Sequence, residues 1–209
     1  MFAIEPIGRN LGASTFHIET KKDIKIHCSD SSILGATLYT PAKPVTGAIM
    51  IAPATGIKRK FYSSFASHLS QNGFGVITYD NNGIGDSLKE PIKTSKATLQ
   101  SWGEIDMPAV LSTLQTNFPG VNYHLVGHSA GGQLVGLMPN AHQLTSMLNF
   151  AASSGRLKNM KLPFRLQARF LMDVFIPINN RLFGYTNTQW VGMGERLPKL
   201  VAAAVVDMV

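Results

Sequence analysis

Cysteine and long apolar runs are scarce in this 209-residue sequence. The single cysteine, Cys28, excludes an internal disulfide framework and is typical of a reducing compartment. No window of about 18 uninterrupted apolar residues occurs, so a membrane-spanning helix is not expected. The first ten residues contain Glu5, Pro6 and Arg9 and lack the apolar core of a signal peptide. Together these absences predict a cytoplasmic protein.

Acidic residues are also in the minority, with 12 Asp and Glu against 19 Lys and Arg. The basic excess lies towards the C-terminus: residues 1–155 carry 11 basic and 9 acidic side chains, whereas residues 156–209 carry 8 and 3. No nucleic-acid-binding motif accompanies this charge, so nucleic acid is not expected as a partner. No His, Cys or Asp cluster has the spacing of metal ligands, and we expect neither a metal nor a cofactor.

What the sequence does contain is an alternation of strand and helix patterns. With 44% hydrophobic residues, the chain is long enough for one sizeable core. Two alternating stretches joined by turn residues predict an antiparallel hairpin, and four apolar stretches predict buried strands. The hairpin covers residues 23–28 and 33–39, and the buried strands cover 47–52, 75–79, 123–126 and 147–151. This order predicts an α/β fold with a mainly parallel sheet flanked by helices.

Two helices are predicted between these strands. Phe61, Phe65 and Leu69 recur at helical spacing before Gly73. Further on, Ser101 and Glu104 have the spacing of a capping box that opens a second helix. Pro108 lies inside that helix and should kink it or reset its start.

Residues 127–132, GHSAGG, carry the pattern G-x-S-x-G between a predicted strand and a helix-compatible segment. A turn this sharp strains the backbone of Ser129, and Gly127 and Gly131 must be small so that strand and helix can approach each other. The amide of Ala130, at the start of the helix, then points at a developing oxyanion. The pattern is short enough to arise by chance, so its context decides its meaning.

Two further loops follow buried strands, and the first of them should share one crevice with Ser129 at the carboxyl edge of the sheet. The first, residues 52–56 (APATG), offers a backbone amide near Thr55 as a second oxyanion donor, or is an ordinary turn. The second, residues 80–87 (DNNGIGDS), lacks the lysine of a nucleotide-binding loop. Its Asp80 and Asp86 are interpreted as turn and cap residues.

In combination, these motifs resemble the α/β-hydrolase superfamily. More narrowly, the chain is similar to bacterial predicted hydrolases of the serine aminopeptidase and monoglyceride-lipase-like branch, over most of its length. The resemblance rests on residues 52–56, residues 80–87, Trp102 with Asp106, and residues 127–132.

The resemblance implies Ser129 as nucleophile, with the amides of Ala130 and Thr55 as the oxyanion hole. The motifs depart from the family pattern at two places. Asn82 occupies the position of an arginine in the pattern D-x-R-G-x-G-x-S, and residues 53–54 replace a His-Gly pair.

A serine triad in this fold continues along the chain with an acid and then a histidine. After Ser129, the sequence contains a single histidine, His142, and two aspartates, Asp173 and Asp207. With a rise of about 1.5 Å per helical residue, His142 should lie some 15 Å from the turn, at the other end of the sheet. His128 cannot easily curl back to the neighbouring hydroxyl. No triad is therefore complete in these residues.

Residues 1–155 are predicted to form the hydrolase core, residues 156–200 a helical lid, and residues 201–209 a divergent tail. The lid mixes basic and apolar side chains, which is typical of a cap over an acyl cleft or of a helix on anionic membrane. Because the last strands of the fold are expected to be missing, the strand at 147–151 should form an unpaired edge that promotes self-association. The chain is interpreted as C-terminally truncated.

The sequence thus predicts a serine hydrolase that acts on an ester, thioester or amide through an acyl-enzyme. The alternatives are a catalytically incompetent fragment or pseudoenzyme without the triad acid and histidine, and a lipid-surface binding module that uses the basic lid. Substrate identity and oligomeric state do not follow from these residues.

Overall fold

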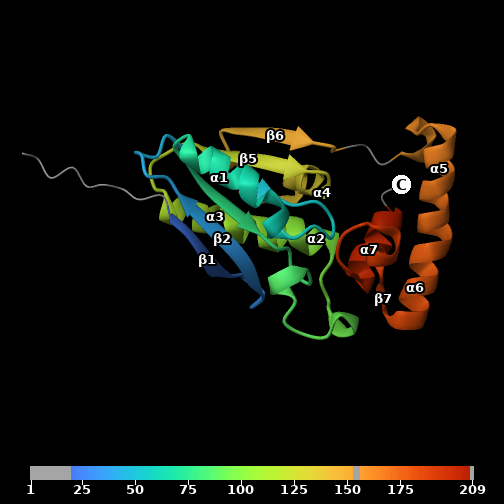
Figure 1. The fold of residues 1–209 in the computed structure, drawn as a ribbon. Helices are drawn as coiled ribbons and strands as arrows, with labels where there is room; N and C mark the ends of the chain where they lie inside the picture. The colour runs from blue at the N-terminus through green and yellow to red at the C-terminus, as the bar shows by residue number, and fades with distance from the viewer. Residues whose placement is uncertain (1–19, 153–155, 208–209) are drawn as a thin grey trace, which may run out of the picture.

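The computed structural model describes residues 20–152 and 156–207, which build a six-stranded sheet, its flanking helices and a helical cap at one end (Figure 1). The strand order is β1-β2-β4-β3-β5-β6. The strands β3 to β6 run parallel, and β1 and β2 form an antiparallel hairpin at one edge, as predicted. Their bounds are Thr20–His27 (β1), Ile33–Thr40 (β2), Gly47–Ala52 (β3), Phe74–Tyr79 (β4), Tyr123–His128 (β5) and Ser146–Phe150 (β6).

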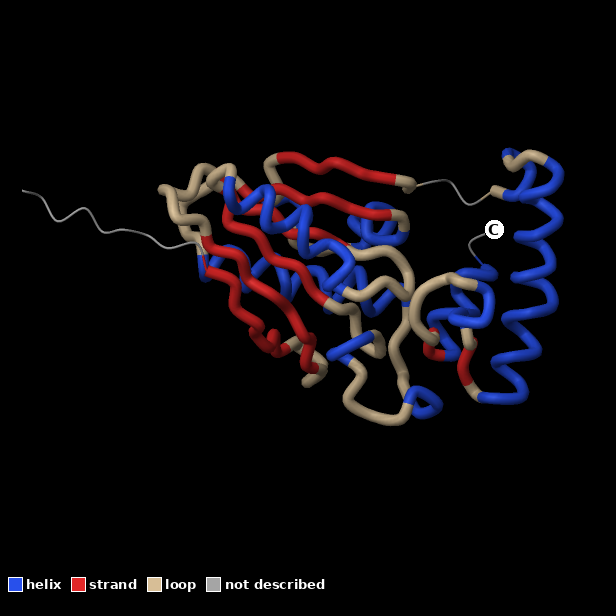
Figure 2. Tube along the Cα trace, in the orientation of Figure 1, coloured by secondary structure: helices blue, strands red, loops and turns tan. Residues whose placement is uncertain are grey.

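The central strand β3 is buried throughout because helices cover both of its faces. Ile49 and Ile51 pack beneath α1 (Ser63–Gln71), whereas Ala48 and Met50 belong to the larger core beneath α3 (Met107–Asn117). This alternation follows from the two-residue period of a strand. Figure 2 shows α1 and α3 on opposite sides of the sheet.

Both predicted helices are present, with two differences from the sequence interpretation. The predicted stripe is not the buried face: Phe61, in the 3-10 turn before α1, is 70% exposed and Phe65 39%, while Ala66 is buried. The predicted cap at Ser101 is wrong by three residues, because Thr98 caps α2 (Leu99–Ser101) and Ser101 returns the hydrogen bond as the third helical residue.

Pro108 resets the second helix, as predicted. A π-helical turn, Trp102–Asp106, separates α2 from α3, and the proline lies in the first turn of α3. The Met107 amide still donates to the carbonyl of Trp102, so the proline lies at the junction of the π-helical turn and α3.

At the other edge of the sheet, β6 pairs only with β5 among the described residues. All five of its residues are exposed, including Met147, Leu148 and Phe150. The predicted unpaired apolar edge is therefore present.

The cap begins after this strand and folds back over the carboxyl end of the sheet (Figure 1). Its long helical column is followed by a short hairpin and a last helix that packs between the column and the sheet. Val201 and Ala202 of that last helix are fully buried and belong to the main core. The elements are α5 (Leu162–Arg169), a π-helical turn (Phe170–Phe175), α6 (Ile176–Phe183), β7 (Tyr185–Thr186), β8 (Leu197–Pro198) and α7 (Lys199–Asp207).

Candidate active site

Ser129 occupies the sharp turn between β5 and the short helix α4 (Ala130–Gln133). Its backbone has φ 50° and ψ −115°, a strained conformation for a residue with a side chain. The strain is held from both sides: the Ser129 amide donates to the carbonyl of Phe150 at 2.8 Å, and the amide of Gly132 donates to the Ser129 carbonyl at 3.0 Å. Strained serines are typical of functional sites, where the turn projects the hydroxyl away from the strand.

The glycines beside Ser129 are required by close backbone approach. A Cβ on Gly127 would lie 2.5 Å from the Cα of Gly132, and one on Gly131 would overlap the carbonyl of Ala52. The strand β5, the helix α4 and the neighbouring strand β3 therefore meet with no room for side chains. This is the physical reason for the small residues in the GHSAGG stretch.

Ser129 lines a cavity of about 300 Å³ between the sheet and the cap. Thr55 lines the same cavity, so the structure brings together two of the residues singled out from the sequence. The cap supplies most of the remaining wall, which is apolar apart from Thr188 and has no charged side chain among the described residues. The full lining is Ala54, Thr55, Ser129, Ala168, Leu171, Met172, Phe175, Ile176, Thr188, Val191, Met193, Leu197 and Val205.

Thr55 lines this cavity, and Ala130 begins the helix that follows Ser129. No hydrogen bond from the Thr55 amide forms within the described part of the chain. Ala130 is the first residue of α4, and the first amides of a helix have no partner within it. The Thr55 turn is fixed by its neighbour, because the amide of Ala54 donates to the Tyr62 hydroxyl at 3.0 Å.

This turn is also tied to the cap. The Glu195 amide donates to the carbonyl of Gly56 at 2.7 Å, and the Glu195 carboxylate lies 2.9 Å from Lys58 Nζ. Gly56 has φ +73°, and a Cβ there would approach the Glu195 carbonyl to 3.2 Å. A hydrogen bond and an ion pair therefore join the cap to the loop that carries Thr55.

His128 points away from Ser129. Its Nδ1 lies 2.9 Å from the hydroxyl of Tyr62, and it lines a separate groove of about 410 Å³ with Phe61 and Phe150. Burial raises the pKa of Tyr62 to about 12, so its hydroxyl remains protonated and bridges His128 to the Ala54 amide. His142 is exposed, and no histidine lines the Ser129 cavity in the described ranges.

The loop at 80–87 is organised by an ion-pair network. Arg59 is 5% exposed, and its Nη1 lies 2.5 Å from Asp80 and 2.7 Å from Asp86. The Arg59 amide also donates to Asp80 at 2.6 Å, and the Ser87 hydroxyl donates to the Asp80 carbonyl at 2.6 Å. Arg59 holds the pKa of Asp86 below its usual value. Asp80 and Asp86 are thus engaged in holding two loops together.

The sequence interpretation did not single out the environment of Asp106. This residue is fully buried, and burial raises the pKa of its carboxyl to about 8. One oxygen accepts from the Asn82 amide at 2.7 Å, while the other has no partner in the described residues. Burial also raises the pKa of the neighbouring Cys28 thiol to about 11. The spacing of Asp106 from Trp102 in the sequence does not indicate that one oxygen of this carboxyl is buried without a hydrogen-bond partner.

Among residues 20–152 and 156–207, no three His, Cys, Asp or Glu side chains converge as metal ligands would. Across the same ranges, none of the helices has the length and apolar character needed to span a bilayer.

The fold and the strained serine turn define an α/β hydrolase, and comparisons with known proteins agree. The family model described as "Serine aminopeptidase, S33" matches residues 43–188. The chain belongs to this family of α/β hydrolases. No protein with a curated description matches the chain by sequence.

Solved structures with the same fold include a thermostable carboxyl esterase from Bacillus coagulans, at 17% identity and a TM-score of 0.55 over 82% of this chain and 51% of that one. The α/β hydrolase GrgF from Penicillium sp. sh18 is similar at 18% identity and a TM-score of 0.57, over 90% of this chain and 76% of that one. At this identity the likeness shows the fold alone. The chain spans 51–54% of the length of the first three structures it matches.

Proposed function

We propose that Ser129 is the nucleophile of a hydrolase that cleaves a small ester, thioester or amide through an acyl-enzyme. The observation that carries this proposal is the position of Ser129, on a strained turn that opens into a cavity shared with Thr55. The membership of the chain in a family of hydrolases supports the proposal.

In this proposal the amides of Thr55 and Ala130 bind the oxyanion. Ala130 directly follows Ser129 and Thr55 lines the same cavity, and neither amide is committed to another acceptor in the described residues. Donors of this kind are effective because they are already oriented in a site that excludes water. Removal of one such donor from an enzyme typically slows catalysis by about 10²–10³.

The cavity wall favours a substrate with an uncharged, apolar acyl group. Among the residues that the structure describes, no Asp or Glu lines the cavity to receive a substrate ammonium, and the polar side chains of the wall are Thr55, Ser129 and Thr188. We therefore assign residues 156–200 the role of a cap that covers the acyl group, over a hydrolase core formed by residues 1–155. Helix α7, within residues 201–209, contributes Val205 to the same wall.

Nucleophilic attack by Ser129 requires a general base that the cavity does not hold in the described residues. A serine hydroxyl is weakly nucleophilic without a partner that takes its proton. In subtilisin, removal of the histidine alone costs about 2 × 10⁶ in kcat. We therefore expect the 209-residue chain to hydrolyse p-nitrophenyl butyrate no faster than its Ser129→Ala variant.

Added imidazole tests the nucleophile separately from the missing base. The chain and its Ser129→Ala variant would be incubated with a fluorophosphonate probe over a range of imidazole concentrations, and the adduct located by mass spectrometry. The proposal predicts labelling at Ser129 that accelerates with imidazole and is absent from the variant. Labelling that is equal in both proteins would reject Ser129 as nucleophile and favour a catalytically incompetent scaffold. Rapid Ser129-dependent turnover without imidazole would instead show that a base is present.

A further inference from the structure

The hydroxyl of Tyr62 lies between the two turns that carry the proposed catalytic groups. It accepts a hydrogen bond from the amide of Ala54 at 3.0 Å, and it lies 2.9 Å from Nδ1 of His128. Ala54 directly precedes Thr55, and His128 directly precedes Ser129. One hydroxyl group therefore links the segment of the proposed oxyanion donor to the segment of the proposed nucleophile.

Two hydrogen bonds hold the peptide groups on either side of the Ala54 Cα. The Ala54 amide donates to Tyr62, and the Ala54 carbonyl accepts from the amide of Ile57 at 3.1 Å. A trans peptide is planar, and no cis peptide occurs in the described residues. The carbonyl of Ala54 and the amide of Thr55 belong to one such plane. The hydrogen bonds that hold Ala54 therefore also set the direction of the Thr55 N–H.

The ring of Tyr62 is held by burial and by its neighbours. It is 7% exposed and lies at the end of a 3-10 turn that begins at Arg59. Arg59 is ion-paired with the buried carboxylate of Asp80. The imidazole of His128 meets the tyrosine ring edge-on, with the ring centroids 6.0 Å apart and the planes at 78°. These contacts fix the hydroxyl relative to both turns.

The direction of each hydrogen bond follows from the groups involved. The Ala54 amide can only donate, so the Tyr62 oxygen is its acceptor and the phenolic proton is left for His128. Burial raises the pKa of Tyr62 to about 12, so this proton is retained at neutral pH. Nδ1 of His128 is then the unprotonated ring nitrogen. The same hydroxyl thus accepts from one turn and donates to the other.

We propose that Tyr62 is a positioning residue of the oxyanion hole, whose hydroxyl sets the distance between the Thr55 amide and the Ser129 hydroxyl. This inference rests on the proposed function, in which Ser129 attacks and the Thr55 amide binds the oxyanion. Tyr62 lines the groove beside His128 and is not among the residues of the Ser129 cavity, so it acts through the two turns. Misplacement of a reacting group by about 1 Å can cost about 10²-fold in rate.

Tyr62→Phe deletes the hydroxyl and keeps the ring. Both proteins would be labelled with an alkyl fluorophosphonate at several probe concentrations and one imidazole concentration, which separates the binding constant KI from the limiting rate kinact. Oxyanion donors act on the attacked phosphoryl group, whereas the apolar wall binds the alkyl chain. A displaced donor should cost less than a removed one, so we expect kinact to fall about tenfold and KI to stay within about twofold.

His128 provides a second test that includes a conservative rescue. Asparagine offers an oxygen near the place of Nδ1, whereas leucine offers no acceptor. His128→Asn should therefore keep kinact near the parent value, and His128→Leu should lower it towards the value of Tyr62→Phe. Because both changes act through one hydroxyl, their effects in the double variant should not add. The nitrogen resonance of His128 Nδ1 should indicate an unprotonated nitrogen in the parent and should shift in Tyr62→Phe.

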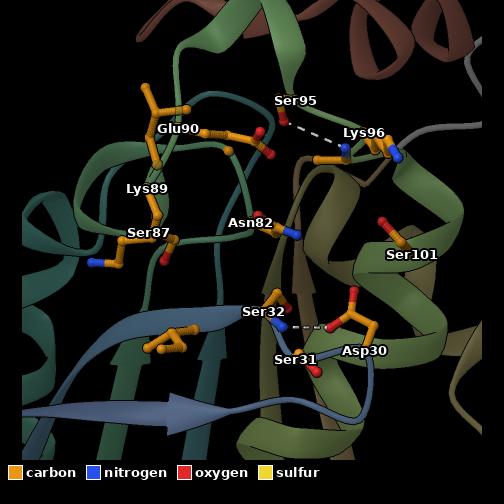
Figure 3. A pocket seen from close by; sticks show the side chains of 14 residues that line it. Asp30, Ser31, Ser32, Asn82, Ser87, Lys89, Glu90, Ser95, Lys96 and Ser101 are labelled. Carbon is orange, nitrogen blue, oxygen red and sulfur yellow. Dashed lines mark hydrogen bonds between the residues drawn. The ribbon is translucent and has the colours of Figure 1, made fainter.

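Two control variants leave this link intact. Tyr123→Phe also deletes a tyrosine hydroxyl bonded to the backbone, at the carbonyl of Phe118 at 2.9 Å, but at the opposite end of β5 from Ser129. Lys96 lines a polar cavity of about 420 Å³ between the turn that follows β1 and the loop that follows β4 (Figure 3). That cavity shares no lining residue with the Ser129 cavity. Tyr123→Phe and Lys96→Ala should both leave kinact unchanged.

The outcomes separate this inference from the proposed function. Absent labelling, or labelling that does not require Ser129, rejects the proposed function and the inference with it. Ser129-dependent labelling with equal kinact in the parent and Tyr62→Phe rejects the positioning role alone. A rise in KI as large as the fall in kinact also rejects it, since that result describes a deformed cavity. If Tyr62→Phe does not fold, equal kinact in His128→Asn and His128→Leu overturns the inference.

Discussion

Replacement of the buried Asp106 by asparagine should stabilise the protein at alkaline pH. Asparagine has nearly the shape of a protonated carboxyl and keeps an oxygen for the Asn82 amide, which lies 2.7 Å from Asp106. It cannot ionise, so it removes the cost of a charge at a fully buried position. The gain should therefore depend on pH, and its size follows from the raised pKa of Asp106.

The pKa of Asp106 moves from 3.8 to about 8 on folding. A group with a raised folded pKa contributes stability that is fully present below its unfolded pKa and is lost as the pH rises through the folded value. One unit corresponds to about 1.4 kcal/mol, so the loss across this window is on the order of 5 kcal/mol. Most of it should appear between about pH 5 and pH 8.5.

Urea denaturation of both proteins at about pH 5 and pH 8.5 measures this effect. The variant should gain several kcal/mol over the parent at the higher pH and much less at the lower pH. Other titrating groups cancel in the difference between the two proteins. Asp86→Asn is the control of opposite sign: Arg59 lowers the pKa of Asp86, so its stabilising contribution is present above the unfolded pKa and is lost in acid. An equal difference between Asp106→Asn and the parent at both pH values would refute the reasoning.

Three further predictions follow from other parts of the structure. Arg59→Met leaves the carboxylate of Asp80 buried without its partner, and should lower the free energy of unfolding by about 3–5 kcal/mol; a urea midpoint unchanged from the parent would contradict this. The chain should self-associate through the exposed edge of β6, and Leu148→Lys should shift sedimentation towards the monomer; a monodisperse parent would contradict it. If the basic outer face of the cap binds anionic vesicles, charge reversal at Arg165 and Arg169 should abolish co-sedimentation, whereas equal pelleting of both proteins would exclude that face.

Residue periodicity was sufficient to predict the sheet. The strand at 47–52 was placed to the residue because an unbroken apolar run has few alternatives to a strand buried on both faces. Gly127 and Gly131 likewise predicted the close packing around Ser129. Where two backbone segments approach closely, the need for a residue without a side chain is visible in the sequence.

Features that depend on distant neighbours were not predictable. The stripe of Phe61 and Phe65 has the spacing of a buried helix face, but the sheet ends at β6 and leaves that side of α1 without cover in the described residues. Asp106 was noticed only for its place in a motif, because its isolation results from the surrounding Asn82 loop and the π-helical turn. The capping box was misplaced because Ser101 fits either end of the pattern, and only the backbone shows that Thr98 begins the helix.

The contact between Glu195 and the turn at Gly56 has a consequence for movement of the cap over the Ser129 cavity. The cap cannot swing away from the sheet without breaking the 2.7 Å hydrogen bond to Gly56 and the 2.9 Å ion pair to Lys58. Both contacts hold the loop that presents the Thr55 amide. If the Thr55 amide binds the oxyanion as proposed, an open cap would leave this donor without that support and a closed cap would restore it. Entry of substrate and stabilisation of the transition state would then require different positions of the cap.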